Sequence, residues 1–160
     1  MLSPDAGFFV NYRLYHPDDF ASLYAIEEAC FALPFRFGRR YMRQLVTSAH
    51  GATWIAEEEG RLAGFGIIEW GPLPAGGNAY IETLEVMPSN RTRGVGRELL
   101  SRLEDSARDA HASAIWLHVD AENHAAIRLY EAHGFHCEGR EQQYYAAERD
   151  ALVYQKALSK

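Results

Sequence analysis

Along much of the chain, apolar and polar residues alternate in short runs that end at turn residues, a pattern typical of β-strands. Between these runs, apolar residues recur every three or four positions, which indicates amphipathic helices. The strand-like runs predict seven strands, at residues 10–15, 53–58, 62–69, 80–87, 114–119, 135–145 and 151–158. The run at 114–119 is almost continuously apolar, so we expect it to be buried in the centre of a sheet.

The helical pattern predicts four helices. The first begins at residues 16–19 and ends before Pro34, and the second covers residues 39–48. The third runs from the loop near residue 94 to about residue 110, and the fourth extends from an Asn123 cap to Gly134. The short Glu59-Gly60 turn between two strands predicts an antiparallel hairpin. Together the elements predict one α/β sheet of mixed direction with helices on its faces.

Composition and charge narrow the class of protein. A chain of 160 residues, 48% hydrophobic and 24% charged, suits one domain spanning residues 1–160. No apolar run approaches the roughly 20 residues needed to cross a bilayer. The first ten residues have no signal-peptide character, so we expect a cytoplasmic protein that binds no membrane. The net charge of −6 argues against nucleic-acid binding and is compatible with a cationic substrate such as an amine.

Residues 90–97, with the sequence NRTRGVGR, lie between the strand at 80–87 and an amphipathic helix. The first N–H groups of a helix have no internal partners, and the helix dipole places partial positive charge there. The two glycines allow a phosphate to approach the backbone closely, and the arginines add charge. The loop therefore predicts an anion site, although an ordinary basic loop before a surface helix is an alternative. Its spacing matches neither a dinucleotide fingerprint nor a P-loop.

Four sequence blocks occur between residues 80 and 135: YIETLEV at 80–86, RxxGxG at 91–96, HxxxxNxxAxxLY at 118–130 and GF at 134–135. In order and spacing they resemble the GNAT superfamily of acyl-CoA N-acyltransferases. The resemblance implies the GNAT fold, a mixed and mostly antiparallel central sheet with helices on both faces, and acetyl-CoA as cosubstrate. The chain looks most similar to protein N-terminal acetyltransferases, including the ribosomal-protein alanine type, through Tyr144-Tyr145, the tail at 150–158 and the loop after Cys30.

The resemblance also implies where acetyl-CoA binds. The pyrophosphate would lie on the backbone of residues 92–97, and the pantetheine arm would pair with the strand at 84–86 like an added strand. The backbone N–H of Val86 would then be an oxyanion donor. Asn123 would hydrogen-bond the cofactor, or act only as a helix cap. The expected cofactor-binding residues are Leu84, Glu85, Val86, Arg91, Thr92, Arg93, Gly94, Val95, Gly96, Arg97, Asn123 and Tyr130.

Three residues are expected to carry catalysis. Tyr130 matches the family's usual acid, which protonates the departing CoA sulfur, although it could be only a core tyrosine. His118 lies in an otherwise apolar strand, where a lone histidine is usually a hydrogen-bonded core residue. In a related N-terminal acetyltransferase group this position is a histidine that works through water with a tyrosine at the place of Tyr80. A histidine can accept a proton at neutral pH, so we expect His118 and Tyr80 to be catalytic.

Two glutamates on the strand at 80–87 are rival bases. Strand alternation places Glu82 on the same face as Tyr80 and Glu85 on the opposite face, unless a bulge intervenes. Many members of the superfamily use a glutamate on this strand. Glu82 is therefore the alternative to His118.

The preferred acceptor is the N-terminal amine of a protein or peptide. Its binding residues are expected to be Phe31, Leu33, Pro34, Phe35, Tyr144 and Tyr145, although the aromatic loop could simply cover the core. The two cysteines, Cys30 and Cys137, have neither metal-site spacing nor the setting of a nucleophile, so direct transfer without a metal is expected. The alternatives are an acetyltransferase for a small amine and a non-catalytic acyl-CoA-binding module. A monomer or a homodimer is expected.

Overall fold

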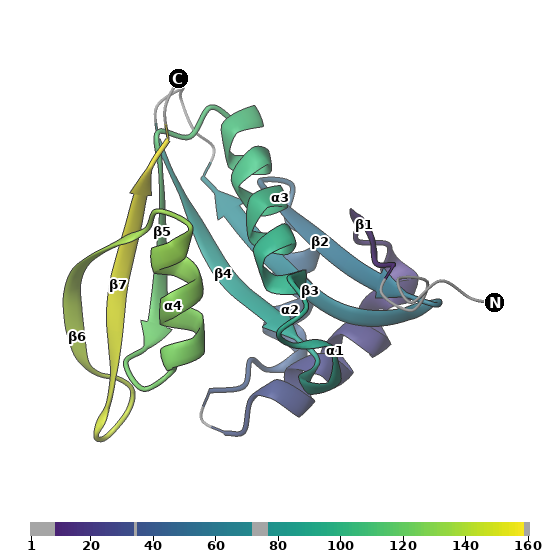
Figure 1. Cartoon of the computed structure of the whole chain (residues 1–160), viewed down its shortest axis with the longest axis horizontal. Helices are drawn as coiled ribbons and strands as arrows, with labels where there is room; N and C mark the ends of the chain where they lie inside the picture. The colour runs from purple at the N-terminus through teal and green to yellow at the C-terminus, as the bar shows by residue number, and fades with distance from the viewer. Residues whose placement is uncertain (1–8, 34, 72–76, 159–160) are drawn as a thin grey trace.

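The computed structural model describes residues 9–33, 35–71 and 77–158, and it contains seven strands and four α-helices (Figure 1). Every predicted strand is present, with bounds that differ from the prediction by no more than two residues at either end. The elements are β1 (Asn11–Leu14), η2 (Pro17–Asp19), α1 (Phe20–Cys30), α2 (Arg39–Val46), β2 (Gly51–Glu58), β3 (Arg61–Trp70), β4 (Asn78–Val86), η3 (Pro88–Asn90), α3 (Val95–Asp109), β5 (Ala114–Asp120), α4 (His124–Ala132), β6 (His136–Ala146) and β7 (Arg149–Ala157).

The seven strands form one sheet in the order β1-β2-β3-β4-β5-β7-β6. All neighbouring pairs are antiparallel except β4 and β5, which run parallel. The prediction of a mixed, mostly antiparallel sheet is confirmed. No helix in the described ranges is long and apolar enough to cross a membrane.

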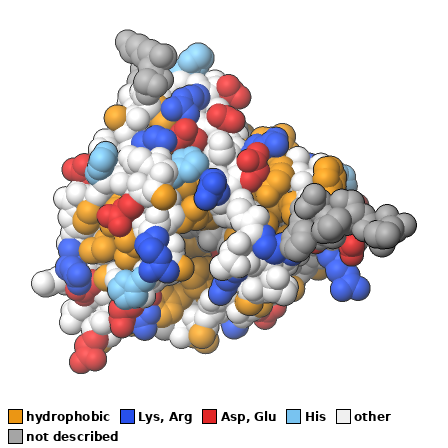
Figure 2. Space-filling view, viewed as in Figure 1, with side chains coloured by type: hydrophobic (Ala, Val, Ile, Leu, Met, Phe, Trp, Pro, Cys, Tyr) orange, Lys and Arg blue, Asp and Glu red, His pale blue; other side chains and the backbone are white. Residues whose placement is uncertain are grey.

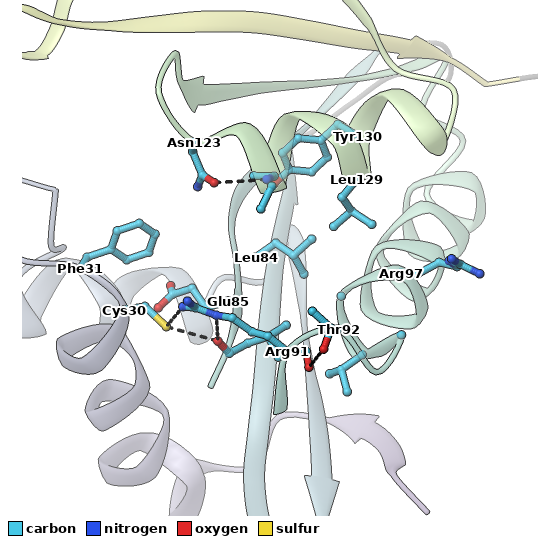
Figure 3. A pocket seen from close by; sticks show the side chains of 16 residues that line it. Cys30, Phe31, Leu84, Glu85, Arg91, Thr92, Arg97, Asn123, Leu129 and Tyr130 are labelled. Atoms are coloured by element: carbon cyan, nitrogen blue, oxygen red, sulfur yellow. Dashed lines mark hydrogen bonds between the residues drawn. The ribbon is translucent and has the colours of Figure 1, made fainter. Parts of the chain in front are cut away.

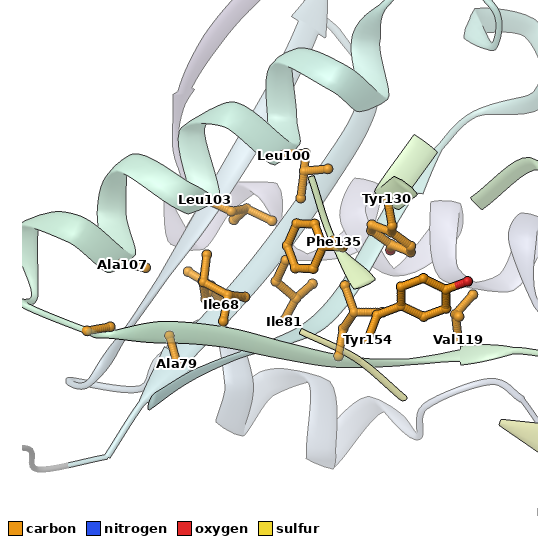
Figure 4. Close-up of a cluster of buried hydrophobic side chains, with 13 residues drawn as sticks. Ile68, Ala79, Ile81, Leu100, Leu103, Ala107, Val119, Tyr130, Phe135 and Tyr154 are labelled. Atoms are coloured by element: carbon orange, nitrogen blue, oxygen red, sulfur yellow. The ribbon is translucent and has the colours of Figure 1, made fainter. Parts of the chain in front are cut away.

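Helices cover both faces of this sheet. α3 and α4 lie on one face, where Leu100 and Leu103 pack against Ile81 and Phe135 (Figures 1 and 4). α1 and α2 lie on the other face, where their apolar side chains pack against β2 and β3. Burial of these two apolar layers accounts for the position of the sheet between the helices.

A β-bulge in β4 sets which side chains reach which face. Residues Ile67 and Ile68 of β3 are consecutive, yet they pair with Thr83 and Ile81, so Glu82 is the extra residue. Ile81 faces the α3 side, whereas Thr83 turns to the α1 side.

The bulge changes the face of every later residue in β4. Glu85 therefore lies on the α1 side, and Leu84 and Val86 pack with α3. Simple alternation would have separated Glu85 from Tyr80 and Glu82. The alternative with a bulge is the one that the structure adopts.

β4 and β5 diverge after a short region of pairing. Their register runs from Asn78 with Ala114 to Ile81 with Leu117, and no pair follows it within the described strands. The sheet is therefore open between the carboxyl ends of these two parallel strands. In α/β sheets, such an opening is where ligands bind.

Candidate functional site

The start of α3 forms one wall of the site. Its N-cap, Gly94, has a φ of 84°, a left-handed conformation that a residue with a Cβ adopts only with strain. The N–H of Glu98 donates the first helical hydrogen bond, to the carbonyl of Gly94 at 3.1 Å. The N–H groups of residues 95–97 precede this bond and leave the helix end as an anion-binding surface.

A cavity of about 580 Å³ opens beside this helix end, between α3, α4, β4 and the end of α1 (Figure 3). In the space-filling view the molecule is hollowed here, with apolar side chains at the bottom and Lys or Arg side chains near the rim (Figure 2). Every residue predicted to bind the cofactor lines it except Arg93. The full lining is Cys30, Phe31, Leu84, Glu85, Val86, Arg91, Thr92, Gly94, Val95, Gly96, Arg97, Asn123, Ala125, Ala126, Leu129 and Tyr130.

Arg91 and Arg93 occupy different places although both belong to the predicted basic loop. The Arg93 guanidinium donates to Glu58 Oε1 at 2.9 Å, and its side chain is outside the cavity lining. The Arg91 Nε donates to the carbonyl oxygen of Val86 at 3.0 Å. Of the two side chains, only that of Arg91 extends along the cavity.

The exposed edge of β4 supplies backbone groups to the cavity. The N–H of Met87 donates to the carbonyl of Ala63, in the β2–β3 hairpin, at 2.8 Å. Because alternate residues of a strand direct their hydrogen-bonding groups to the same neighbour, those of Leu84 and Val86 face the opening toward β5. Backbone donors and acceptors thus line the opening, as strand-like binding of an extended ligand requires.

Tyr130 and Asn123 reach the cavity from α4 (Figure 3). Burial raises the pKa of Tyr130 above its usual value, and the negative charge of Glu85 adds to the shift, so the phenol stays protonated at neutral pH. The Asn123 side chain accepts a hydrogen bond from the N–H of Ala126 at 3.2 Å. The helix-cap role of Asn123 is confirmed, and its side chain also lines the cavity.

Tyr80 and His118 form a second group, on the α1 and α2 side of the opening. The Tyr80 hydroxyl lies 2.7 Å from His118 Nδ1, next to the last paired residues of β4 and β5. His118 Nε2 lies 3.0 Å from Glu141 Oε1 on β6. The Tyr144 ring stacks on the imidazole with centroids 4.4 Å apart. Burial and the neighbouring Tyr144 raise the pKa of Tyr80 above its usual value.

Glu82 lies beside this group, near α2. The Tyr41 hydroxyl donates to its Oε2 at 3.5 Å. Burial, together with the adjacent Glu69 carboxylate, raises the pKa of Glu82 to about 7. Glu82 could thus exchange a proton near neutrality.

Glu85 is in a different environment, although it belongs to the same strand. Its side chain is buried against Glu27 of α1, and Thr83 donates to its Oε2 at 2.6 Å. Burial raises the pKa values of both Glu27 and Glu85, and the negative charge of Glu27 raises that of Glu85 further. The raised pKa values therefore favour the protonated form of these carboxyl groups at the wall of the cavity.

The predicted acceptor-binding residues divide between the two faces. Phe31 lines the cavity. The Phe35 and Tyr145 rings are in contact, with centroids 5.0 Å apart, and Tyr145 meets Tyr144 edge to face. Leu33 is 78% exposed, and Pro34 lies outside the described residues. The loop after α1 thus provides part of a wall, while Phe37 packs against the core.

Several residues at the site were not among the sequence predictions. Cys30, Ala125, Ala126 and Leu129 line the cavity, and the last two belong to the HxxxxNxxAxxLY motif at 118–130. Glu141 and Tyr41 join the His118 side only because the sheet and α2 bring distant segments together. No local sequence pattern marks them. Among the described residues, no group of three or more His, Cys, Asp or Glu side chains is placed to hold a metal ion.

Comparison with known proteins identifies the family. The family model for the acetyltransferase (GNAT) family matches residues 14–135. Ribosomal protein bS18-alanine N-acetyltransferase of Escherichia coli K12 is 28% identical over 151 residues, which cover 88% of this chain and 93% of that protein. Streptothricin acetyltransferase of Streptomyces lavendulae is 35% identical over 88 residues, 54% of this chain, and the match spans only 46% of that enzyme.

Solved structures have the same fold. The crystal structure of the Escherichia coli ribosomal-protein-S18-alanine N-acetyltransferase gives a TM-score of 0.82 at 24% identity, covering 95% of this chain and 96% of that one. Arabidopsis thaliana NAA60, solved with a bisubstrate analogue, gives 0.81 at 23% identity, covering 93% and 98%. Since the family match also spans most of the chain and includes the cavity-forming loop, this protein belongs to the GNAT family of acetyltransferases and is an N-acetyltransferase.

Proposed function

We propose that this enzyme transfers an acetyl group from acetyl-CoA to the N-terminal α-amine of a protein or peptide. The observation that carries the proposal is the hydrogen-bonded pair of Tyr80 and His118, 2.7 Å apart beside the opening between β4 and β5. The cavity approaches this opening from the α3 and α4 side, and Tyr144 and Tyr145 lie with the pair on the other side. The acetyl donor would enter from the cavity, and the amine acceptor would reach it from the side of Tyr80 and His118.

The polar and apolar groups of the cavity match those of acetyl-CoA. The helix start at Gly94 supplies N–H groups for the pyrophosphate, and the edge of β4 supplies groups that an extended pantetheine arm can pair with. Residues with side chains on the α3 face, such as Leu84 and Leu129, give the arm an apolar floor. The volume of about 580 Å³ lies within the range of ligand pockets in proteins.

The reaction needs a neutral amine, a stabilised oxyanion and a protonated leaving group. The amine nitrogen attacks the thioester carbonyl and loses a proton toward Tyr80 and His118. The backbone N–H of Val86, which faces the opening, can donate to the oxyanion that forms. The C–S bond then breaks, and Tyr130, whose raised pKa keeps its proton, donates to the departing sulfur. The products are the acetylated amine and CoA.

An α-amine suits a histidine base better than a lysine does. Neutralising an α-amine of pKa about 7.7–8.0 at pH 7 costs roughly 1 kcal/mol, whereas a lysine at about 10.4 costs nearly 5 kcal/mol. The relative acting on a ribosomal-protein alanine matches this chain over nearly its full length, which supports the same acceptor class. The shorter match to streptothricin acetyltransferase makes a small-molecule amine the second candidate.

The test is CoA release from acetyl-CoA with three sets of acceptors: free N-terminal peptides, lysine peptides blocked at the N-terminus, and small amines. We expect turnover with the first set, and a loss of about 10²- to 10⁴-fold in kcat for His118→Ala. His136→Ala, which changes an exposed histidine at the start of β6, is the matched control. Turnover on small amines alone, with His118→Ala fully active, would contradict the proposal and leave Glu82 as the base.

A further inference from the structure

We propose that Glu141 is a positioning residue, which fixes the tautomer of His118 so that Nδ1 is the proton acceptor facing Tyr80. This inference rests on the proposed function of the Tyr80–His118 pair. Glu141 Oε1 lies 3.0 Å from His118 Nε2, while Tyr80 lies 2.7 Å from Nδ1 on the opposite side of the ring. Both ring nitrogens therefore have a partner.

The chemistry of the two partners determines where the proton sits. A carboxylate only accepts hydrogen bonds, so Glu141 requires a proton on Nε2. In a neutral imidazole the other nitrogen is then an acceptor, and Nδ1 receives the O–H of Tyr80. Without Glu141 the opposite tautomer, with Nδ1–H donating to the Tyr80 oxygen, becomes available, and in that form His118 accepts no proton from Tyr80.

Packing holds the ring in this orientation. The Tyr144 ring is parallel to the imidazole, with an interplanar angle of 2°, and its centroid is 4.4 Å away. The centroid of the Tyr80 ring is 5.7 Å from that of the imidazole, and the two rings are tilted by 56°. With two ring contacts and two hydrogen bonds, rotation of the imidazole would break several contacts at once.

The sheet register brings Glu141 to His118 across one intervening strand. His118 of β5 pairs with Val153 of β7, and Glu141 of β6 pairs with Ala151 of the same strand. Val153 and Ala151 are two residues apart and share a face of the sheet. The position level with His118 on β6 is Gly139, which has no side chain. Glu141 therefore reaches the imidazole diagonally across β7.

This arrangement supports transfer of a proton from the amine through Tyr80 to His118. As the amine attacks, its N–H proton passes to the Tyr80 oxygen while the phenolic proton of Tyr80 moves to Nδ1. His118 becomes an imidazolium, and the Glu141 carboxylate next to Nε2 stabilises its positive charge. The titratable groups that face His118 are Tyr80 from β4, and Glu141 and Tyr144 from β6.

The kinetic test compares Glu141→Ala, Glu141→Asp and the matched control Glu138→Gln, on the same strand, with whichever amine the enzyme accepts. We expect Glu141→Ala to lower kcat about 10- to 100-fold with KM nearly unchanged. Glu141→Asp should recover part of kcat. Glu141→Ala should have no further effect in a His118→Ala background.

The second measurement is independent of any substrate. The ¹⁵N chemical shifts of the imidazole distinguish the two tautomers, and we expect the Nε2–H form at His118 in wild type and loss of this preference in Glu141→Ala. A wild-type ring with the proton on Nδ1 would overturn the inference, as would Glu141→Ala with unchanged kcat. If N-terminal peptides are not acetylated but the tautomer depends on Glu141, only the proposed acceptor class is wrong.

Discussion

The two sides of the opening between β4 and β5 are built in different ways. On the α3 side, backbone groups provide much of the polar surface of the cavity: the first N–H groups of α3, after the left-handed Gly94, and the edge of β4. On the α1 and α2 side, the groups are side chains, with Tyr80, His118 and Glu141 brought together from three strands. The first side suits a constant ligand, and the second can change with the acceptor.

This difference predicts which substitutions each side should tolerate. A backbone site depends on conformation and on the absence of a Cβ, so few residue changes outside its glycines remove its donors. A side-chain site depends on each functional group directly. Variants on one side should therefore change the affinity for CoA, and variants on the other should change the chemical step.

The largest effect is expected from Tyr80→Phe, which removes the hydroxyl but keeps the ring. We expect kcat to fall by about 10²- to 10⁴-fold, because the amine loses its proton path to His118. The dissociation constant for CoA, measured by calorimetry, should stay within about twofold of wild type. Tyr12→Phe on β1 is the control. A comparable loss of CoA affinity in Tyr80→Phe would show that the two sides are not separable.

Gly96→Val should instead weaken the binding of CoA. A Cβ at Gly96 would lie 3.3 Å from Leu129 Cδ2 and 3.7 Å from Val86 Cγ2, so the larger side chain must push α3 and α4 apart or narrow the cavity. We expect CoA to bind about 10- to 100-fold more weakly, a change of roughly 1–3 kcal/mol. Gly38→Ala has open space around its Cβ and should bind CoA like wild type. Unchanged CoA binding in Gly96→Val would place the ligand elsewhere.

Tyr130→Phe tests the residue expected to donate a proton to the departing CoA sulfur. Its ring packs edge to face against Phe135, so the variant keeps the packing and loses only the hydroxyl. We expect kcat to fall about tenfold, less than in Tyr80→Phe, since a thiolate leaves readily without full protonation. A thioester donor with a more acidic thiol should reduce this difference. The prediction fails if both donors show equal loss.

The smallest effect concerns the buried Glu27–Glu85 pair. Because the folded pKa values are raised, the folded state binds more protons than the unfolded state, and stability falls as pH rises from about 4.3 through the raised values. Glu27→Gln removes one titrating group, and its amide can donate to Glu85. We expect this variant to be about 1–2 kcal/mol more stable than wild type at pH 8, with a flatter profile.

Denaturant unfolding between pH 5 and pH 8 measures this difference. Glu28→Gln, an exposed neighbour on α1, should follow the wild-type profile. If Glu27→Gln is destabilised at pH 8, burial of the Glu27 carboxyl group does not lower the stability of the folded state at that pH.

The same contrast explains how much the sequence could predict. Residues 84–97 are contiguous and form a strand, a loop and a helix start, so the cavity on the α3 side followed from local pattern and from the family resemblance. His118 and Tyr80 were also predicted, because both lie within quoted motifs. Glu141 was missed because its contact with His118 depends on the register of β6 and β7, which is interrupted by two shifts. Single-sequence patterns do not fix such registers.

The face of Glu85 was left open for a similar reason. A bulge adds one residue to a strand without a compulsory sequence signal, and residue types at Glu82 and Thr83 are compatible with either arrangement. What decided it was tertiary: Ile81 packs toward α3 while Thr83 and Glu85 turn to α1.

The bulge at Glu82 also has a consequence for how this protein can vary. The bulge adds one residue to β4, and this extra length does not depend on the residue being a glutamate. Replacing Glu82 would alter a side chain beside Tyr41, whereas deleting it would exchange the two faces for every later residue of β4. Glu85 would then point into the apolar layer under α3. The length of β4 is therefore subject to a stricter constraint than its composition at this position, so homologues should differ here by substitution and rarely by a gap.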